Sequence, residues 1–286
     1  MPSTRELRRR IKSVNSTRQI TKAMELVAAS KMRRATEAAV GSRPYQQKLG
    51  LLVQRALADL PSHHPLFKKR PVRKLALLII SSDRGLAGAH NTAILKQAFQ
   101  IQRERKAQNQ EVSVITLGKK VEASLNRLGW PILESYPHPS SQPNPAIIRP
   151  ISRSIINSFI NQEFDEVAII YTEFISALHQ EARIIPLLPL IPPPQTERLT
   201  AQFLFEPSSS AVLDQLLPRS VETSILHALQ EALASEHSAR RMAMKTATDN
   251  ASEMIDDLTL TYNGVRQSAI TQELAEITSG SAGSNS

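Results

Sequence analysis

The sequence predicts an α/β domain inserted between two long terminal helices that pair as an antiparallel coiled coil. Two observations support this fold class. Each end of the chain carries a long stretch that is poor in glycine and proline and has apolar residues at helical spacing. The middle instead alternates apolar strand-like segments with helical stretches, which is typical of a mostly parallel sheet covered by helices.

The N-terminal helix is expected to cover residues 1–60, with a cap near Ser3. Its apolar stripe is narrow and lapses between Thr17 and Thr21, which fits a seam with one partner helix better than a face buried in a globule. The stripe comprises Leu7, Ile11, Val14, Met24, Val27, Ala28, Met32 and Ala35. Pro44 is expected to kink or interrupt this helix.

The C-terminal helix is predicted over residues 219–286, because the segment from 219 to about 277 contains no proline and a single glycine. Its seam has Ala247, Ala251, Met254, Leu258, Tyr262 and Val265, and Leu226, Leu229 and Leu233 repeat the pattern earlier. At ~1.5 Å per residue such a helix would be roughly 90 Å long. We therefore expect much of it to project from the domain or to be enclosed by other subunits.

The middle of the chain, residues 61–218, is expected to form the inserted domain, with a Rossmann-like alternation of strands and helices. The expected strands are residues 74–81, 111–117 and 165–172. The expected helices are about residues 91–106, 119–128 and 150–162. Two proline-rich segments, 137–150 and 186–194, are predicted to be connections.

Composition and charge exclude several classes of function. The chain has no cysteine, which excludes disulfides, thiol nucleophiles and thiolate zinc sites. No apolar run approaches the ~20 residues of a membrane-spanning helix, so we expect no direct membrane insertion, and we expect no signal or transit peptide. Residues 1–43 carry eleven Lys/Arg against three acids, whereas residues 219–286 carry five against nine. Opposite charges favour pairing of the two terminal helices.

The motif search predicts no catalytic residue, no cofactor and no metal. The turn from Ser82 to Asn91 places Gly85 and Gly88 between a strand and a helix, where backbone N–H groups can hold an anion. It lacks the glycine pattern of dinucleotide sites and the Gly-Lys-Ser/Thr ending of a P-loop, so we interpret it as a tight structural turn. The seven histidines show no metal-ligand spacing, and there is no Gly-x-Ser-x-Gly motif.

Both chain ends closely resemble the gamma subunit of F-type ATP synthases, the central stalk of that complex. The resemblance covers roughly the first 45 and the last 60 residues, with scattered support between them. The matching segments are Arg8–Val14, Ile20–Met32, Arg43–Tyr45, Ser81–Leu86 with Gly88 and Asn91, Glu236–Arg240, Ala243–Asn250, Leu258–Asn263, Arg266-Gln267, Ile270–Glu273 and Glu276-Ile277.

This resemblance implies a non-catalytic rotary subunit that couples ion-driven rotation of the membrane c-ring to ATP synthesis or hydrolysis. The terminal helices would form a shaft inside a ring of alpha and beta subunits. The α/β domain would form a foot that sits with the epsilon subunit on the c-ring, without nucleic acid as a partner. The expected location is peripheral, on the cytoplasmic side of a bacterial energy-coupling membrane.

The resemblance also assigns contact residues. Beta-subunit contacts are expected at Met24, Arg240, Arg266, Gln267, Thr271 and Glu273, and c-ring contacts at Phe205 and Glu206. The chain departs from the family pattern at Ala87, His90 and Arg241, where a cysteine, an apolar residue and a methionine are usual. The plant-type insertion with regulatory cysteines is absent, so no thiol switch is expected.

Two alternatives remain open on the sequence alone. The basic cluster between Arg8 and Arg34 would suit a coiled-coil protein that binds a polyanion or nucleic acid, although it lacks interleaved aromatic residues for base stacking. The strand–helix alternation would also suit a small α/β enzyme with helical extensions.

Overall fold

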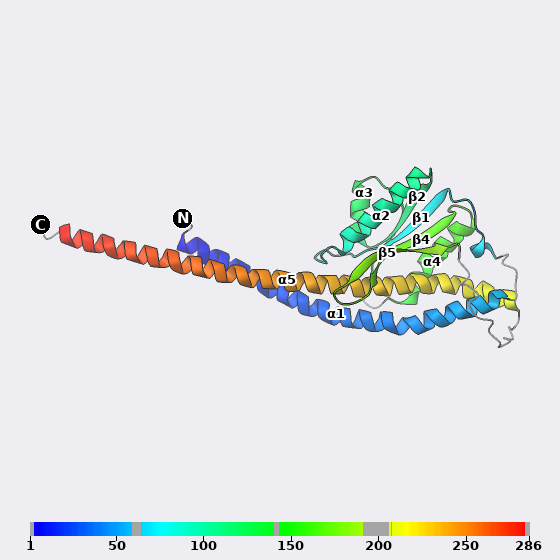
Figure 1. Ribbon diagram of the computed structural model, residues 1–286, viewed down its shortest axis with the longest axis horizontal. Coiled ribbons are helices and arrows are strands. Elements are labelled where there is room, and N and C mark those ends of the chain that lie inside the picture. The colour runs from blue at the N-terminus through cyan, green and yellow to red at the C-terminus, as the bar shows by residue number, and fades with distance from the viewer. Residues whose placement is uncertain (1–2, 59–63, 140–142, 191–205, 207, 284–286) are drawn as a thin grey trace. The chain divides into compact units, whose positions relative to one another are not determined.

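The computed structural model describes residues 3–58, 64–139, 143–190, 206 and 208–283 (Figure 1). Its elements are α1 (Thr4–Ala58), the short 3₁₀ helix η1 (Pro65–Phe67), β1 (Lys74–Ile80), α2 (His90–Ala107), β2 (Glu111–Leu117), α3 (Lys119–Arg127), β3 (Ile132–Tyr136), α4 (Pro145–Ile160), β4 (Glu166–Phe174), β5 (Gln180–Leu188) and α5 (Ser209–Gly283). The chain divides into two compact units: an α/β unit, Ala29–Arg240, and an end unit, Met1–Ala28 with Arg241–Ser286.

The α/β unit is built on one five-stranded sheet in the order β3-β2-β1-β4-β5. The first four strands are parallel, and β5 runs antiparallel to β4 at the edge. The prediction of a mostly parallel sheet with alternating helices is therefore confirmed. The strands expected at 74–81, 111–117 and 165–172 are present as β1, β2 and β4, whereas β3 and β5 were not predicted.

Both faces of the sheet are buried, and alternate residues of β1 contribute to two separate cores. Leu75, Leu77 and Ile79 face α2 and α3, which cover one side of the sheet in Figure 1. Ala76, Leu78 and Ile80 belong to the other core, which includes α4 and the Leu213–Leu233 part of α5. A central strand buried on both faces is apolar throughout, which explains its uninterrupted apolar sequence.

Helix α1 passes through Pro44 as one continuous element. Of the two outcomes expected there, a kink or an interruption, the interruption is wrong. A proline inside a helix removes one backbone hydrogen bond and costs roughly 3 kcal/mol. Packing of the turns on either side offsets this cost, because Ala39, Leu49 and Val53 are buried within the α/β unit. Tertiary contacts here override the local preference of the chain.

The predicted bounds of helices and strands are also wrong near prolines at three other places. Helix α4 begins at Pro145, not near residue 150, because Asn144 caps it by accepting a hydrogen bond from the Ala146 N–H at 3.0 Å. Strand β5 runs through Pro186, which its edge position permits. Helix α5 begins at Ser209, ten residues before the predicted start, and it includes Pro218. Residues 191–194 of the second expected connection lie outside the described residues.

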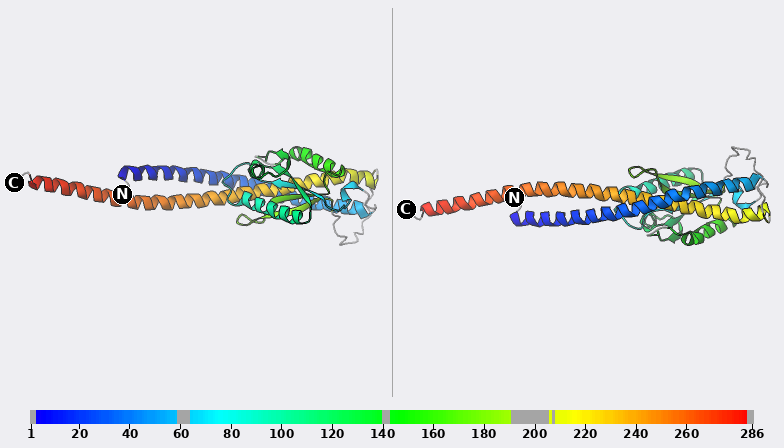
Figure 2. Two further views of the ribbon diagram at one scale, coloured as in Figure 1. Left: turned by 90° about the horizontal axis from the view of Figure 1, so that it is seen from above. Right: turned by 90° about the horizontal axis from the view of Figure 1, so that it is seen from below.

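In the end unit, the two ends of the chain pair as antiparallel helices, as both views of Figure 2 show. Arg8 donates a hydrogen bond to the Tyr262 hydroxyl at 2.7 Å, and the Thr248 hydroxyl donates to that of Thr21 at 2.8 Å. Thr21 follows Arg8 in α1, whereas its partner Thr248 precedes Tyr262 in α5. The two helices therefore run in opposite directions. The expected pairing of the N- and C-terminal helices is confirmed.

The seam itself differs from the prediction in detail. Its buried residues in the end unit include Leu7, Thr21, Ala28, Met244 and Ala251. Thr21 was expected to interrupt the seam, but its hydroxyl is satisfied across the helix pair and can be buried there.

Two predicted seam residues face outward, Val27 with 57% and Met254 with 52% of its surface exposed. A strict heptad pattern drifts by about 20° per heptad from a straight α-helix, which misplaces such neighbours. Farther back in α5, Leu229 and Leu233 are buried in the core against the sheet, and half-buried Leu226 packs against that core.

Gly118 occupies a position in the α/β unit where a residue with a Cβ atom does not fit. It precedes α3 with φ +118°, and a Cβ atom there would lie 2.1 Å from the backbone oxygen of Ser81. We predict that Gly118→Ala lowers the free energy of unfolding by roughly 2 kcal/mol or more. Urea denaturation followed by circular dichroism would measure the change.

Gly41→Ala provides the matched control. Gly41 lies inside α1, and nothing stands within 4 Å of the position of its added Cβ. This substitution should raise stability by about 0.5–1 kcal/mol, because alanine is the better helix former. Equal effects of the two substitutions would contradict the close approach at Gly118.

Candidate functional site

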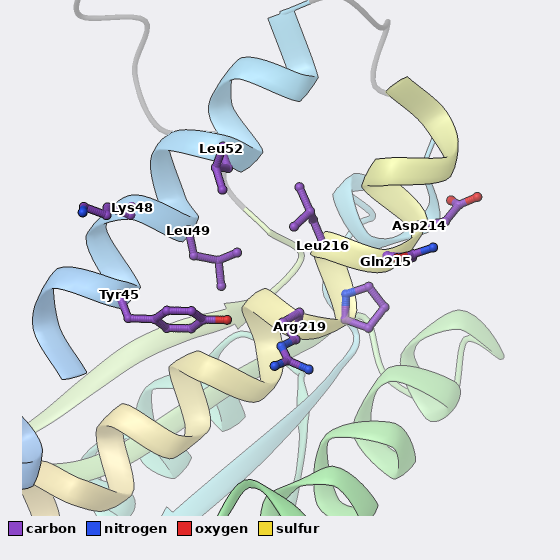
Figure 3. Close-up of a pocket in the computed structure, with 9 residues that line it drawn as sticks. Tyr45, Lys48, Leu49, Leu52, Asp214, Gln215, Leu216 and Arg219 are labelled. Atoms are coloured by element: carbon purple, nitrogen blue, oxygen red, sulfur yellow. The ribbon is translucent and has the colours of Figure 1, made fainter. Parts of the chain in front are cut away.

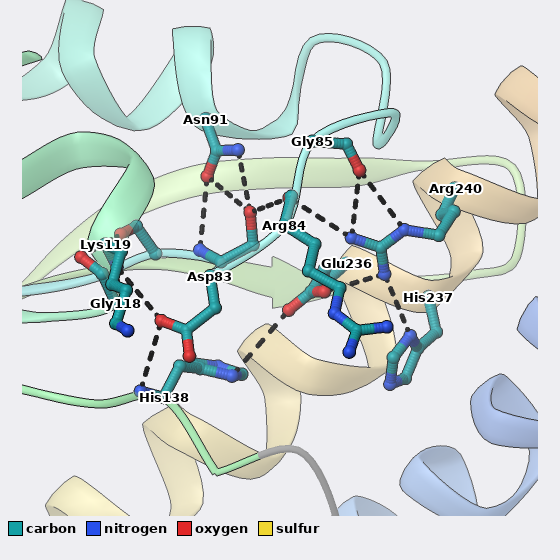
Figure 4. A network of polar contacts seen from close by, with 12 residues as sticks. Asp83, Arg84, Gly85, Asn91, Gly118, Lys119, His138, Glu236, His237 and Arg240 are labelled. Carbon is teal, nitrogen blue, oxygen red and sulfur yellow. Dashed lines mark hydrogen bonds and ion pairs between the residues drawn. The ribbon is translucent and has the colours of Figure 1, made fainter. Parts of the chain in front are cut away.

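The carboxyl ends of β1, β2 and β3 lie at one edge of the sheet, and polar side chains gather there against α5 (Figure 4). They come from the β1–α2 loop, the β2–α3 turn, the segment after β3, and one turn of α5. We call this set the carboxyl-edge network. Its members are Asp83, Arg84, Gly85, Asn91, Gly118, Lys119, His138, Glu236, His237 and Arg240, which Figure 4 labels, and Ser82, which bonds to Arg84 and Asn91.

The β1–α2 loop is closed by its own polar groups. The Ser82 hydroxyl donates to the Arg84 backbone oxygen at 2.7 Å, and the Ser82 N–H donates to Asn91 Oδ1 at 3.2 Å. Asp83 Oδ1 accepts from the Lys119 N–H at 3.0 Å, at the N-terminus of α3. An aspartate of the β1–α2 loop therefore occupies the N-terminus of the neighbouring helix α3, and the loop is tied to the rest of the unit by structural contacts.

Arg240 joins this loop to α5. Its guanidinium donates to the backbone oxygens of Gly85 and Arg84, both at 3.3 Å. It also donates to Glu236 Oε1 at 2.7 Å and contacts His237 Nδ1 at 3.2 Å. Only 9% of the Arg240 surface is exposed, so the ion pair with Glu236 is largely withdrawn from water. A charge-assisted hydrogen bond in such a place holds its partners firmly, and removal of either one leaves a buried charge.

Three buried histidines surround this ion pair. Burial lowers the pKa of His90 to about 4, and it lowers the pKa of His237 to about 4 as well. Burial also lowers the pKa of His138, whose Nδ1 lies 3.9 Å from Glu236 Oε2. For Glu236, burial would raise the carboxyl pKa, but attraction to His138 in its protonated form and to Arg240 outweighs burial and lowers that pKa. At neutral pH these three imidazoles are therefore neutral and surround one ion pair.

Within the part of the chain that the structure describes, no group of three or more His, Asp or Glu side chains is arranged to hold a metal ion. Over the same residues, no helix combines the length and the hydrophobicity that a bilayer crossing requires. What the carboxyl-edge network can do is join the sheet to α5 through directional hydrogen bonds.

The beta-contact residues predicted on α5 fall into two places. Four lie close together in the end unit and are exposed: Arg266, Gln267, Thr271 and Glu273. Their spacing puts Gln267 and Thr271 one turn apart, and the Thr271 hydroxyl donates to the Gln267 backbone oxygen at 2.9 Å. Arg240 lies in the α/β unit instead, bound to its own chain. Met24 is half-buried on α1 of the end unit.

Of the two predicted c-ring contacts, Phe205 lies outside the described residues, and Glu206 is exposed shortly before α5. The start of α5 and α1 also line an open pocket of about 740 Å³ in the α/β unit (Figure 3). Tyr45, Leu49 and Leu52 enter it from α1, and Leu216 and Arg219 from α5. Sequence reasoning did not identify this pocket, because its lining residues are about 170 positions apart in the chain and share no motif.

The fold defines the class of proteins in which an α/β domain is inserted between two long terminal helices. Solved structures of this class are similar to the chain. The Euglena gracilis mitochondrial ATP synthase rotor in rotational state 1 gives a TM-score of 0.66 at 20% identity, covering 93% of this chain and 98% of that one. The Tetrahymena thermophila mitochondrial ATP synthase central stalk and c-ring structure gives 0.61 at 23% identity, covering 80% and 99%.

Sequence comparison identifies the family. The family described as ATP synthase matches residues 3–283. The ATP synthase gamma chain of Pelotomaculum thermopropionicum is 42% identical over 284 residues, which cover 99% of both chains. That of Herpetosiphon aurantiacus is 41% identical over 295 residues and covers both chains completely. The chain belongs to the ATP synthase gamma chain family, as the resemblance of its two ends predicted.

The buried histidines near the Glu236–Arg240 ion pair predict an acid-sensitive fold. His90 takes up a proton near pH 6.5 in the unfolded chain but only near pH 4 in the folded one. Its contribution to stability is therefore complete above pH 6.5 and is lost as the pH falls toward 4. At pH 5 the loss should be roughly 2 kcal/mol for this histidine.

Replacement of His90 by leucine tests this directly. His90 is 5% exposed and its Nδ1 has no hydrogen-bond partner, so His90→Leu removes a buried polar group without removing a hydrogen bond of that nitrogen. Urea unfolding at pH 7 and pH 5 should show a smaller acid-induced loss for the variant, by roughly 2 kcal/mol. An unchanged loss between the two pH values would contradict the burial of a neutral His90.

Proposed function

We propose that this chain is the rotary central-stalk subunit that couples ion-driven rotation of a c-ring to ATP synthesis or hydrolysis in a ring of alpha and beta subunits. The observation that carries the proposal is the match over 99% of both chains with a relative named ATP synthase gamma chain. The antiparallel pairing of the two chain ends supports it, because a helix pair resists twisting and bending better than a single helix does.

In this proposal the chain is a non-catalytic subunit. Its partners are the alpha, beta and epsilon subunits and the c-ring, and its location is the cytoplasmic face of a bacterial energy-coupling membrane, reached through the c-ring. Residues 1–60 and 219–286 would belong to the shaft and residues 61–218 to the foot. The family match gives no support to the alternative of a nucleic-acid-binding protein.

The basic N-terminal cluster has a simpler explanation in the end unit. Arg10 pairs with Glu6 at 3.4 Å, and Lys22 pairs with Glu25 at 3.0 Å, each within one turn of α1. Arg8 hydrogen-bonds Tyr262 and lies over its ring, with 5.6 Å between the guanidinium carbon and the ring centroid. These contacts support α1 as one half of a helix pair.

The proposed contacts with a beta subunit are Met24, Arg240, Arg266, Gln267, Thr271 and Glu273. Exposure of the last four on neighbouring turns of α5 supports them as one contact surface. A guanidinium such as that of Arg266 suits an acidic partner loop through charge-assisted hydrogen bonds. Any contact of Arg240 would be made by the small fraction of its surface that remains exposed. For the c-ring we propose Phe205 and Glu206, of which the exposed Glu206 is described.

A proline in the paired part of α5 tests the rotary function. Leu258 is half-buried in the end unit and lies in the interior of α5. Leu258→Pro should break the helix at a cost of roughly 3 kcal/mol or more, because it removes a backbone hydrogen bond and crowds the preceding turn. In assembled complexes in membrane vesicles, ion-driven ATP synthesis should fall at least tenfold.

Leu258→Ala is the matched control, since it shortens the same side chain and keeps the helix intact. It should retain most of the coupled ATP synthesis. Coupled synthesis at the normal rate in the Leu258→Pro complex would show that an unbroken shaft is not required, and the proposed function would then fail.

A further inference from the structure

We propose that Arg240 clamps α5 to the β1–α2 loop so that torque passes between the foot and the shaft, and that Glu236 is the positioning residue of this clamp. The inference rests on the proposed rotary function. It assigns Arg240 a role inside the chain, in addition to the proposed contact with a beta subunit. The clamp comprises Arg240, Glu236 and the backbone oxygens of Arg84 and Gly85.

The clamp lies where α5 leaves the α/β unit. Arg240 is the last residue of that unit, and α5 continues without a break to Gly283. The apolar core that holds α5 to the sheet extends only from Leu213 to Leu233. Apolar contacts are not directional, whereas hydrogen bonds fix direction. The last attachment of α5 to this unit is therefore made by polar groups.

The polar side chains of α5 bind two different places in the unit, the β4–β5 hairpin and the β1–α2 loop. The Ser235 hydroxyl donates to the Thr172 backbone oxygen at 3.0 Å, and the Ser238 hydroxyl donates to that of Ala177 at 2.6 Å, both at the β4–β5 hairpin. Arg240 binds the β1–α2 loop instead. At 3.6 residues per turn, Ser235 and Arg240 point in directions about 140° apart around the helix axis. Rotation of α5 about its own axis would have to break one set or the other.

Glu236 determines where the Arg240 guanidinium points. It lies one turn earlier on α5, is 5% exposed, and its Oε1 accepts from Arg240 at 2.7 Å. The geometry leaves the other guanidinium nitrogens directed at the backbone oxygens of the loop. His138 Nδ1 lies 3.9 Å from the second carboxylate oxygen, Oε2, which accepts no hydrogen bond from the described residues. The position of the carboxylate is therefore set by its bond to Arg240. Without its carboxylate, a buried guanidinium loses its counter-charge and is expected to turn toward water.

Two conservative substitutions test the clamp in the assembled ATP synthase. Arg240→Lys keeps the charge but loses the forked donors, and Glu236→Gln keeps the shape but loses the charge. The matched controls are Arg103→Lys and Glu163→Gln, both at exposed positions of the α/β unit. The measured quantities are ions pumped per ATP hydrolysed and the hydrogen exchange of backbone amides in residues 81–90.

We expect both clamp variants to exchange these amides at least tenfold faster and to lower the ratio of pumped ions to hydrolysed ATP at least threefold. The ratio does not depend on the number of intact complexes, so a lower yield of complex alone would not change it. Glu236→Asp, which restores the charge, should recover at least half of the ratio. Both control variants should match the unmodified complex in exchange and in pumping.

Three results would overturn the proposal. The first is a normal pumping ratio in the Arg240→Lys complex. The second is a reduced ratio in Arg240→Lys but not in Glu236→Gln, because Arg240 would then act through a contact outside the chain. The third is unchanged hydrogen exchange of the amides in residues 81–90 of the full-length variant chain. This measurement tests the clamp even in a variant that does not assemble into the complex. Failure of the proposed rotary function is distinct from all three, because it would remove pumping from the unmodified complex.

Discussion

The antiparallel pairing of α1 with α5 is the contact on which the function of this chain depends. In the end unit, small and apolar residues such as Leu7, Ala28 and Ala251 are buried between the helices. The hydroxyls of Thr21 and Thr248 bind each other at 2.8 Å, which fixes the register of the pair. A helix pair held in register can carry a twisting force that a single helix in water could not.

Within the α/β unit, two kinds of contact hold α5 to the sheet. Burial of the sheet on both faces makes it rigid, with α2 and α3 on one side and α4 and part of α5 on the other. The carboxyl-edge network then adds an ion pair and several hydrogen bonds at the end of the apolar contact. In other proteins with a parallel sheet this edge commonly binds a ligand, whereas here side chains of the same protein fill it.

Local pattern predicted most of the fold. The strand at 111–117 was predicted with its exact bounds, and the helix beginning at Lys119 with its exact start, because apolar periodicity is strong there. Strand β3 (Ile132–Tyr136) and strand β5 (Gln180–Leu188) lie at the two edges of the sheet and are only partly buried. Their sequences therefore lack the uninterrupted apolar run of a central strand, and Pro186 argued against the second one.

The candidate site was predictable only in part. The segment Glu236–Arg240 was recognised by resemblance, but the partners of Arg240 are backbone oxygens about 155 residues away. Any residue can supply a backbone oxygen, so no pattern of side chains in the sequence predicts this contact. His90 was noted as a departure from the family, and its burial beside the ion pair emerges only when α2, the segment after β3 and α5 come together.

The most direct test of the account is a disulfide across the helix pair. The chain has no cysteine, so Thr21→Cys with Thr248→Cys would introduce the only two thiols, at positions whose hydroxyl oxygens are 2.8 Å apart. If the chain ends turn together as one shaft, the oxidised pair should form a cross-link within the chain, and ATP-driven ion pumping by the assembled complex should stay within about twofold of the reduced state. Absence of the cross-link, or loss of pumping that a reductant restores, would contradict a shaft of two helices fixed to each other.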